Sequence, residues 1–296
     1  SNFAGLLRLS DSNFRGTGQT VGINFLQATE GTGASIDLDY SNPWIDRKDT
    51  SLQVSLYSRL VFRFAGTNFG GNQVPTNDSR YTERRTGATI GFARPINDEL
   101  STSLTTRIER IKTSDLNTNV GNSFIQQDGD VAVLSFGATR NRRDVDIDPS
   151  RGDWTRLMVE PGYSNITKVG GAVASGASTG SSTFLRTTLE YRNYFSSGPP
   201  RGRELDAPRR VLAVRARLGM IAGDVPFFEQ FFAGGSDTVR GYQEDRFWGK
   251  HQFLATVEYR HPIQKSFNAI AFVDYGGAWG VCGAGNQFAQ TNKLDH

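Results

Sequence analysis

The sequence has few of the residues on which metal and thiol chemistry depends. Its 296 residues include one cysteine, Cys282, and three histidines, at positions 251, 261 and 296. A single cysteine excludes a disulfide within the chain and any CxxC metal or redox motif. Three scattered histidines leave little basis for a zinc centre or a histidine-dependent active site. The composition therefore speaks against enzymes that use thiol chemistry and against enzymes that depend on zinc or histidine.

Long apolar runs are also missing. No segment approaches the roughly 18 consecutive apolar residues that a transmembrane helix needs, and the mean hydropathy is −0.44. The first residues, Ser1 to Ala4, lead directly into patterned sequence rather than into a signal peptide. If the protein is exported, we expect this chain to be a mature piece or a fragment.

Lysine is scarce as well. Only 6 of the 33 basic residues are lysine, which leaves 27 arginines, and the formal net charge is +3. A nucleic-acid-binding protein gathers its basic residues into a patch or stripe. Here the arginines are spread along the chain and interleaved with aspartate and glutamate, so we expect no nucleic-acid partner.

What the chain does have is alternation with a period of two residues, which is typical of β-strands. In residues 52–64 one face is apolar, and the other carries Gln53, Ser55, Tyr57, Arg59 and Arg63. The apolar face consists of Leu52, Val54, Leu56, Leu60, Phe62 and Phe64. The pattern predicts about twelve strands, near residues 3–9, 21–25, 34–40, 52–64, 88–92, 103–110, 131–138, 154–160, 185–195, 212–220, 253–259 and 269–275.

Three features favour a membrane barrel over a soluble sandwich. The polar faces carry full charges, which suits a water-filled lumen, and several strands have the length of about ten residues that crosses a bilayer. Long connections also alternate with shorter ones, as in outer-membrane barrels. The long connections are predicted at residues 65–80, 112–130, 164–183 and 221–252. The predicted fold is therefore all-β, a transmembrane antiparallel β-barrel with its apolar strand faces against lipid and the first three of these loops on the cell surface.

Some features have ordinary structural explanations. Residues 176–180 match the GxSxG pattern of hydrolases, but their surroundings are rich in glycine and serine and predict a loop, not a strand-to-helix elbow. Trp44, Trp154 and Trp279 lie near predicted strand ends, where an interfacial aromatic girdle or simple packing would explain them.

One stretch of sequence carries a specific family resemblance. Residues 231–242 read FFAGGSDTVRGY, and they are followed by VEYRHPI at 257–263 and AFVDYGGAW at 271–279. Residues 13–18 and 42–45 are similar to early turns of the same family. Together these segments resemble the C-terminal barrel of the outer-membrane protein-insertase superfamily, the bacterial surface antigen barrels that include BamA, TamA and the chloroplast Toc channel.

The resemblance implies a barrel of 16 strands preceded by periplasmic POTRA domains. By that template the chain covers about 12 strands, the second to the thirteenth. We therefore expect residues 1–296 to be one transmembrane β-barrel domain that is partial, with the POTRA domains and the terminal strands absent. The lateral seam between first and last strands would then lie outside this chain.

The same stretch contains the candidate site. Glycines next to Arg240 permit positive φ and a tight loop, and Glu258 and Asp274 occupy the polar phase of two neighbouring strands. Two carboxylates can receive one guanidinium fork, and the resemblance implies that the loop folds back into the lumen. A solvated loop arginine is the alternative. The predicted lumen loop motif is Gly234, Gly235, Val239, Arg240, Gly241 and Tyr242, and its lumen-wall partners are Glu258 and Asp274.

The resemblance implies a protein of the bacterial outer membrane, ahead of a plastid outer envelope, that inserts or translocates polypeptides without enzymatic activity or a cofactor. Its partners would be unfolded outer-membrane or secreted polypeptides, the lipid bilayer, periplasmic chaperones and accessory lipoproteins. A two-partner secretion transporter and a passive diffusion porin remain alternatives. A soluble β-domain that binds a ligand is a third class.

Overall fold

The computed structural model describes residues 4–28, 33–63, 81–113, 125–171, 179–197, 209–264 and 267–280. Twelve strands form one antiparallel sheet in which neighbours along the chain are neighbours in space, except that β10 pairs with β13. The strands are β1 (Ala4–Phe14), β2 (Gln19–Ala28), β3 (Ala34–Asn42), β4 (Ser51–Arg63), β5 (Tyr81–Pro95), β6 (Leu100–Thr113), β7 (Ile125–Asn141), β8 (Gly152–Gly171), β9 (Gly180–Ser196), β10 (Val211–Gly223), β13 (His251–Gln264) and β14 (Phe267–Trp279). The predicted number of strands is confirmed.

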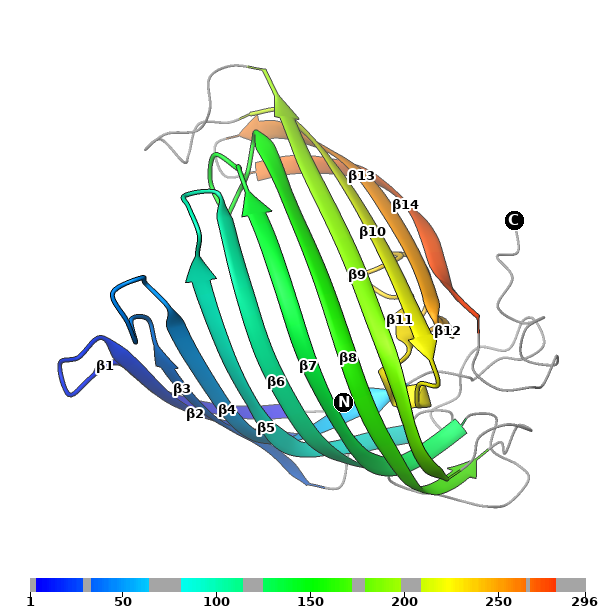
Figure 1. Cartoon of the computed structure of the whole chain (residues 1–296). Coiled ribbons are helices and arrows are strands. Elements are labelled where there is room, and N and C mark those ends of the chain that lie inside the picture. Colours follow the sequence, from blue (N-terminus) through cyan, green and yellow to red (C-terminus); the bar gives the residue numbers. More distant parts are fainter. Residues whose placement is uncertain are drawn as a thin grey trace.

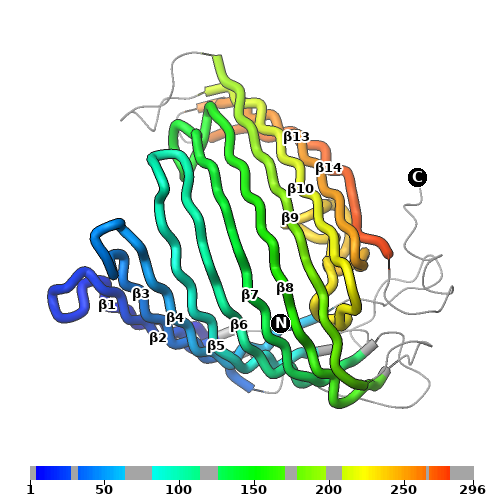
Figure 2. The backbone as a smooth tube through the Cα atoms, viewed as in Figure 1, coloured from blue at the N-terminus to red at the C-terminus, as the bar shows by residue number. Residues whose placement is uncertain are grey.

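The sheet is curved like the wall of a barrel (Figures 1 and 2). Strands β1 and β14 are its two edges, and within the described residues no ladder joins them. Inside the curve lie the 3₁₀ helix η2 (Phe227–Glu229) and a small hairpin of β11 (Phe231–Ala233) and β12 (Phe247–Gly249), which sequence patterning did not predict. In the part of the chain described here, no helix has the length and apolar character needed to span a membrane.

The predicted phase of the strands is confirmed by side-chain exposure. On β4, Leu56 is 51% exposed on the outer face, whereas Ser55 and Tyr57 on the inner face are 8% and 7% exposed. Strand β13 shows the same division, because Val257 points outward at 46% while Leu254 is 2% exposed. The apolar side chains outside therefore form the surface that faces lipid, and most charged side chains of the wall lie on its inner face. An exception is the pair Arg110–Asp130, which lies on the outer phase of β6 and β7 and is 66% and 43% exposed.

Several strands extend further than predicted. Residues 164–171 continue β8 and β9 begins at Gly180, so much of the predicted loop 164–183 is strand. Likewise β6 continues to Thr113 and β7 begins at Ile125, inside the predicted loop 112–130. The backbone ladder persists there although serine, glycine and lysine interrupt the apolar alternation. Strand ends beyond the apolar band meet water on both faces, so their side chains need not alternate. All of the predicted loop 65–80 lies outside the described residues.

The largest apolar core lies inside the curve of the sheet. Inward-facing apolar residues of the wall pack there against the segment between β10 and β13. The cluster contains Ile111, Val131, Val133, Ile166, Phe184, Ile221, Val225, Phe228, Phe231, Ala233, Val239, Phe247, Leu254 and Ala278. The inner face of the wall can therefore carry apolar side chains because the segment between β10 and β13 covers them.

Candidate functional site: a loop anchored inside the barrel

The segment between β10 and β13, residues 224–250, is called the lumen loop here. It contains η2 and the β11–β12 hairpin. The FxGG motif, residues 232–235, begins within β11, and the VRGY motif, residues 239–242, lies between the two hairpin strands. The side-chain amide of Gln252 on β13 donates to the carbonyl of Phe232 at 3.0 Å, which ties the hairpin to the wall. The predicted fold-back of this loop into the lumen is what the structure shows.

The glycines of the motif allow its tight turn. Gly234 and Gly235 have φ values of +116° and +90°, which residues with a side chain rarely adopt. A Cβ atom on Gly234 would lie 2.1 Å from the carbonyl oxygen of Gln243. Thr238 closes the turn, because its hydroxyl accepts from the amide of Gly234 at 2.7 Å and donates to the carbonyl of the same residue at 2.8 Å.

Arg240 forms the first anchor of the lumen loop. Its Nε and Nη2 donate to the two carboxylate oxygens of Asp274 at 2.6 and 2.8 Å, and its backbone amide donates to Oδ2 at 3.1 Å. Its Nη1 lies 3.6 Å from a carboxylate oxygen of Glu258. The guanidinium also lies over the ring of Phe272, with Cζ at 3.3 Å from the ring centre. The structure thus brings together the three residues that the sequence singles out.

The other motif residues support this anchor. Val239 is 3% exposed and belongs to the lumen core, and the ring of Tyr242 packs against Phe247 with 5.2 Å between ring centres. Gly241 has a φ of +92°. The bidentate contact and the packing of Val239 place Arg240 against the wall, unlike a solvated loop arginine. Hydrogen bonds to Asp274 raise the pKa of Arg240 above its ordinary value, so the anchor stays charged.

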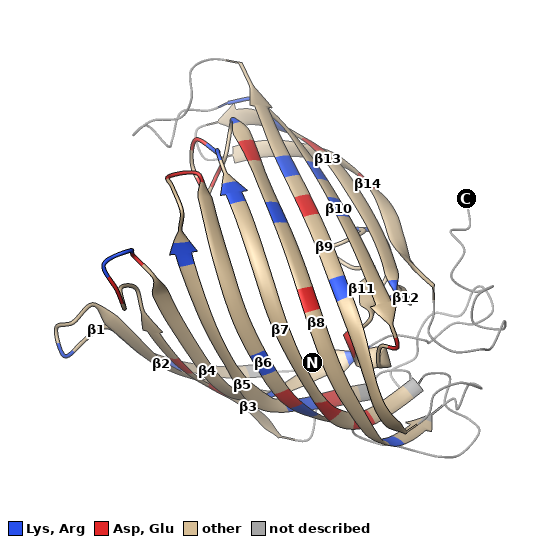
Figure 3. Ribbon diagram, viewed as in Figure 1, with Lys and Arg blue, Asp and Glu red and all other residues tan. Residues whose placement is uncertain are grey.

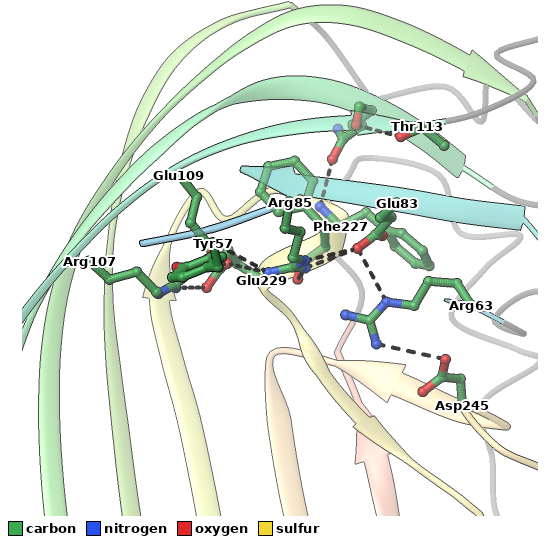
Figure 4. A network of polar contacts seen from close by, with 12 residues as sticks. Tyr57, Arg63, Glu83, Arg85, Arg107, Glu109, Thr113, Phe227, Glu229 and Asp245 are labelled. Carbon is green, nitrogen blue, oxygen red and sulfur yellow. Dashed lines mark hydrogen bonds and ion pairs between the residues drawn. The ribbon is translucent and has the colours of Figure 1, made fainter. Parts of the chain in front are cut away.

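A second anchor lies near the start of the lumen loop. Glu229 at the end of η2 is 3% exposed and receives guanidinium groups from three strands. Figure 4 shows two of these groups, those of Arg85 and Arg107. Arg107 on β6 contacts its carboxylate at 2.8 and 3.1 Å, Arg186 on β9 at 3.1 Å and Arg85 on β5 at 3.4 Å. Arg85 also donates to the backbone carbonyl of Phe228 at 2.9 Å. Three arginines therefore hold both the side chain and the backbone of this segment.

The arginines around Glu229 are neutralised by further acids of the wall. Arg85 contacts Glu83 at 3.0 Å and Glu109 at 3.4 Å, and Arg186 contacts Glu160 at 2.8 Å. Tyr57 donates to Glu109 at 2.6 Å. Most of this network appears in Figure 4, where side chains of β4, β5 and β6 converge on the loop. It is a buried polar network in which each charge has a partner of opposite sign.

The charge state of Glu229 follows from these contacts. Burial disfavours a carboxylate and by itself would raise its pKa. The positive charges of Arg107, Arg186 and Arg85 outweigh the burial and hold the pKa of Glu229 at about 2, below the ordinary 4.5. Glu229 is therefore ionised at neutral pH, and the anchor is an ion cluster.

Sequence reasoning missed this second anchor. Glu229 is separated from its arginine partners by 43 to 144 residues, so no short motif contains them. One signal was present: Glu229 is an acid within an aromatic segment, FFEQFF at residues 227–232. An acid in such a segment is either exposed or paired.

Two of the remaining candidates from the sequence are not described by the structure. Ser178 of the GxSxG match and Cys282 lie outside the described residues. Among the residues that are described, no group of three or more His, Cys, Asp and Glu side chains is arranged to hold a metal ion.

The fold and the site define a class: a transmembrane β-barrel wall whose lumen holds a loop anchored by its VRGY arginine. The Omp85 superfamily domain matches residues 13–294, nearly the whole chain, and the chain belongs to the Omp85 superfamily. Family and apolar outer face together place it in the bacterial outer membrane.

Two known proteins illustrate the relationship. The chain is 25% identical over 194 residues to the outer membrane protein assembly factor BamA of Nitratidesulfovibrio vulgaris strain Hildenborough, which covers 60% of this chain and 22% of the relative. The crystal structure of BamA from Haemophilus ducreyi lacking POTRA domains 1–3 matches with a TM-score of 0.64 at 16% identity, over 94% of this chain and 56% of that one. The chain therefore spans about a fifth of the length of the curated relative.

Proposed function

We propose that the chain is the barrel part of an outer-membrane insertase that assembles β-barrel proteins. Membership of the Omp85 superfamily and similarity to an assembly factor support this proposal. The observation that carries it is the lumen loop, with its VRGY arginine held on Asp274 of the wall at 2.6 and 2.8 Å. A loop bound this firmly inside the lumen suits a barrel that handles polypeptides better than an open diffusion pore.

The proposed mechanism uses backbone pairing and no covalent step. An edge strand presents unpaired amide and carbonyl groups, which can bind an incoming strand by β-augmentation. The lumen loop would support the wall from inside, since its anchors lie on β5, β6 and β9 and on β13 and β14. In this proposal the protein is not an enzyme, it needs no cofactor, and its substrates are unfolded outer-membrane polypeptides.

Finer aspects of the proposal concern the rest of the protein. Residues 1–296 would be one barrel domain, with POTRA domains contributed by a longer chain. Accessory lipoproteins and periplasmic chaperones would deliver the substrate. Detection of POTRA repeats in the full-length gene product would support these aspects.

The test is an insertion assay with the full-length protein in phosphatidylcholine vesicles. Unfolded substrate barrel is added, and folded product is counted by its heat-modifiable mobility on a gel. We expect the wild type to accelerate folding, Arg240→Ala to lose most of the acceleration and Arg240→Lys to recover little, because one ammonium cannot replace a planar fork. Wild-type protein that conducts small ions freely but leaves substrate folding unchanged would indicate a porin and contradict the proposal.

A further inference from the structure

A second set of arginines lies on the inner face of the wall, beyond the tip of the lumen loop and toward the turn end of the strands. On β8, β9 and β10 the register aligns Arg156, Glu190 and Arg217 in one row. The next row aligns Trp154, Arg192 and Arg215. The six residues are called the arginine grid here; charged residues along these three strands are visible in Figure 3. The inward direction is shown by Arg215, whose Nη1 donates to the carbonyl of Asp237 in the lumen loop at 3.3 Å.

The grid has more positive than negative charge. Its single acid, Glu190, is already used: it accepts from Arg192 at 2.6 and 2.8 Å and from Arg215 at 2.9 Å. Within the described residues, Arg156 and Arg217 have no ion pair or hydrogen bond, although they flank Glu190 at the same register. The Nε atom of Arg217 is shielded from solvent and has no partner. A donor that is shielded from solvent and has no partner destabilises the folded state. A role in binding a ligand explains its presence.

Part of the grid lines a cavity. A cavity of about 290 Å³ lies between the loop tip and the wall. Arg192 and Arg215 of the grid line it together with Arg240 and Arg260, and its acids are Asp237, Glu258 and Asp274. Glu258 and Asp274 are already bound to Arg240. Trp154 packs beside the grid, with the guanidinium of Arg192 at 4.9 Å from its ring centre. This contact places Trp154 on the lumen face, although its position in the sequence also fits an interfacial girdle.

The lumen itself shows which ligand such a wall can hold. Glu229 is a carboxylate on a peptide segment that lies inside the barrel and is bound by Arg85, Arg107 and Arg186 of the wall. The grid repeats this type of surface with its guanidinium groups only partly neutralised. Planar guanidinium forks match carboxylates in bidentate geometry. We propose that the arginine grid and its cavity bind carboxylate side chains of a polypeptide within the lumen; the source of that polypeptide rests on the proposed function.

Direct binding tests the site without relying on insertion. The full-length protein is placed in nanodiscs of zwitterionic phosphatidylcholine and titrated calorimetrically with a capped hexapeptide of alternating serine and glutamate. The control ligand is the same peptide with glutamine in place of glutamate. We expect the glutamate peptide to bind at least about tenfold more tightly, because hydrogen bonds between charged groups are the stronger ones.

The double variant Arg156→Gln with Arg217→Gln should lose about tenfold in affinity for the glutamate peptide. The matched control, Arg59→Gln with Arg110→Gln, also removes two positive charges. These arginines pair with Asp37 and Asp130 on other strands, so the control should bind like the wild type. Heat-modifiable mobility verifies that each variant is folded.

Equal binding of the two peptides by the wild type would overturn the proposal, even if the double variant failed to fold. So would equal loss in both double variants, which would reveal a general effect of net charge. Displacement of the peptide by inorganic phosphate, but not by the same concentration of acetate, would assign the site to phosphate and overturn the carboxylate assignment. Each result is distinct from failure of the proposed function, which is measured separately as substrate folding in vesicles.

Discussion

The two anchors of the lumen loop use opposite arrangements of charge. At the first part of the loop an acid, Glu229, is held by arginines of β5, β6 and β9. At the VRGY motif a base, Arg240, is held by acids of β13 and β14. A loop that shifted or reversed its position would place like charges together at both ends. The opposite polarity therefore specifies one docking of the loop.

The anchors also differ in burial. Glu229 is 3% exposed, whereas the side chain of Arg240 is 29% exposed and reaches the cavity of the lumen. Deletion of one partner of an ion pair lowers stability the most when the pair is fully buried, because water cannot solvate the charge that remains. We infer that the Glu229 anchor contributes more to stability, and that the Arg240 anchor is the one that a polypeptide in the lumen can reach.

Removal of the Glu229 charge should have the largest effect. Glu229→Gln keeps the shape of the side chain but leaves Arg85, Arg107 and Arg186 clustered without it. The free energy of unfolding in vesicles, measured by urea titration, should fall by about 3–5 kcal/mol. Glu244→Gln on the same loop is the control, since this exposed residue should change stability by less than about 0.5 kcal/mol. Similar losses in both variants would show that the cluster has no special role.

A substitution on the lipid-facing side of the wall provides a reference for the size of these stability losses. Leu56→Arg places a charge on the outer face of β4 and should cost about 2–4 kcal/mol, as charges near the middle of a bilayer do. Ser55→Arg, one residue earlier on the lumen face, should cost much less because Asp39, its hydrogen-bond partner at 2.6 Å, is an acid. Comparable losses in a refolding assay would contradict the assignment of the two faces.

The Arg240 anchor should contribute less to the free energy of unfolding than the Glu229 anchor, but more to insertion activity. Arg240→Ala removes the bidentate contact with Asp274 and should lower the free energy of unfolding by about 1.5–3 kcal/mol, while insertion activity falls more than in Glu244→Gln. Protease cleavage within residues 224–250, followed on a gel, should become faster. Unchanged cleavage and activity would indicate a solvated arginine and remove the distinction between the anchors.

Acid should release the Glu229 anchor only at low pH. Since the pKa of Glu229 is lowered from 4.5 to about 2, its contribution is complete above pH 4.5 and is lost as the pH falls through about 2. The stability difference between wild type and Glu229→Gln should therefore be constant from pH 7 to about pH 4.5 and shrink below it. A difference that already disappears near pH 6 would contradict the ion cluster.

Sequence was sufficient for the wall and for one of these anchors. Alternation placed Leu56 outside and Ser55 inside because a strand turns every second side chain to the same face. The motif around Arg240 and the phase of Asp274 pointed to the first anchor. The Glu229 anchor was not accessible in this way, since it depends on the register of β5, β6 and β9 and on where η2 lies. Strand ends were also missed, because the backbone pairing of residues 164–171 continues where the apolar pattern stops.

The most direct test of the central claim is a double-mutant cycle on Arg240 and Asp274. Free energies of unfolding in vesicles are measured for the wild type, Arg240→Ala, Asp274→Ala and the double variant. If the arginine is bound to the wall carboxylate, the two losses are not additive and the coupling energy is about 1–3 kcal/mol. A coupling energy near zero would show that Arg240 and Asp274 act independently and would contradict an anchored lumen loop.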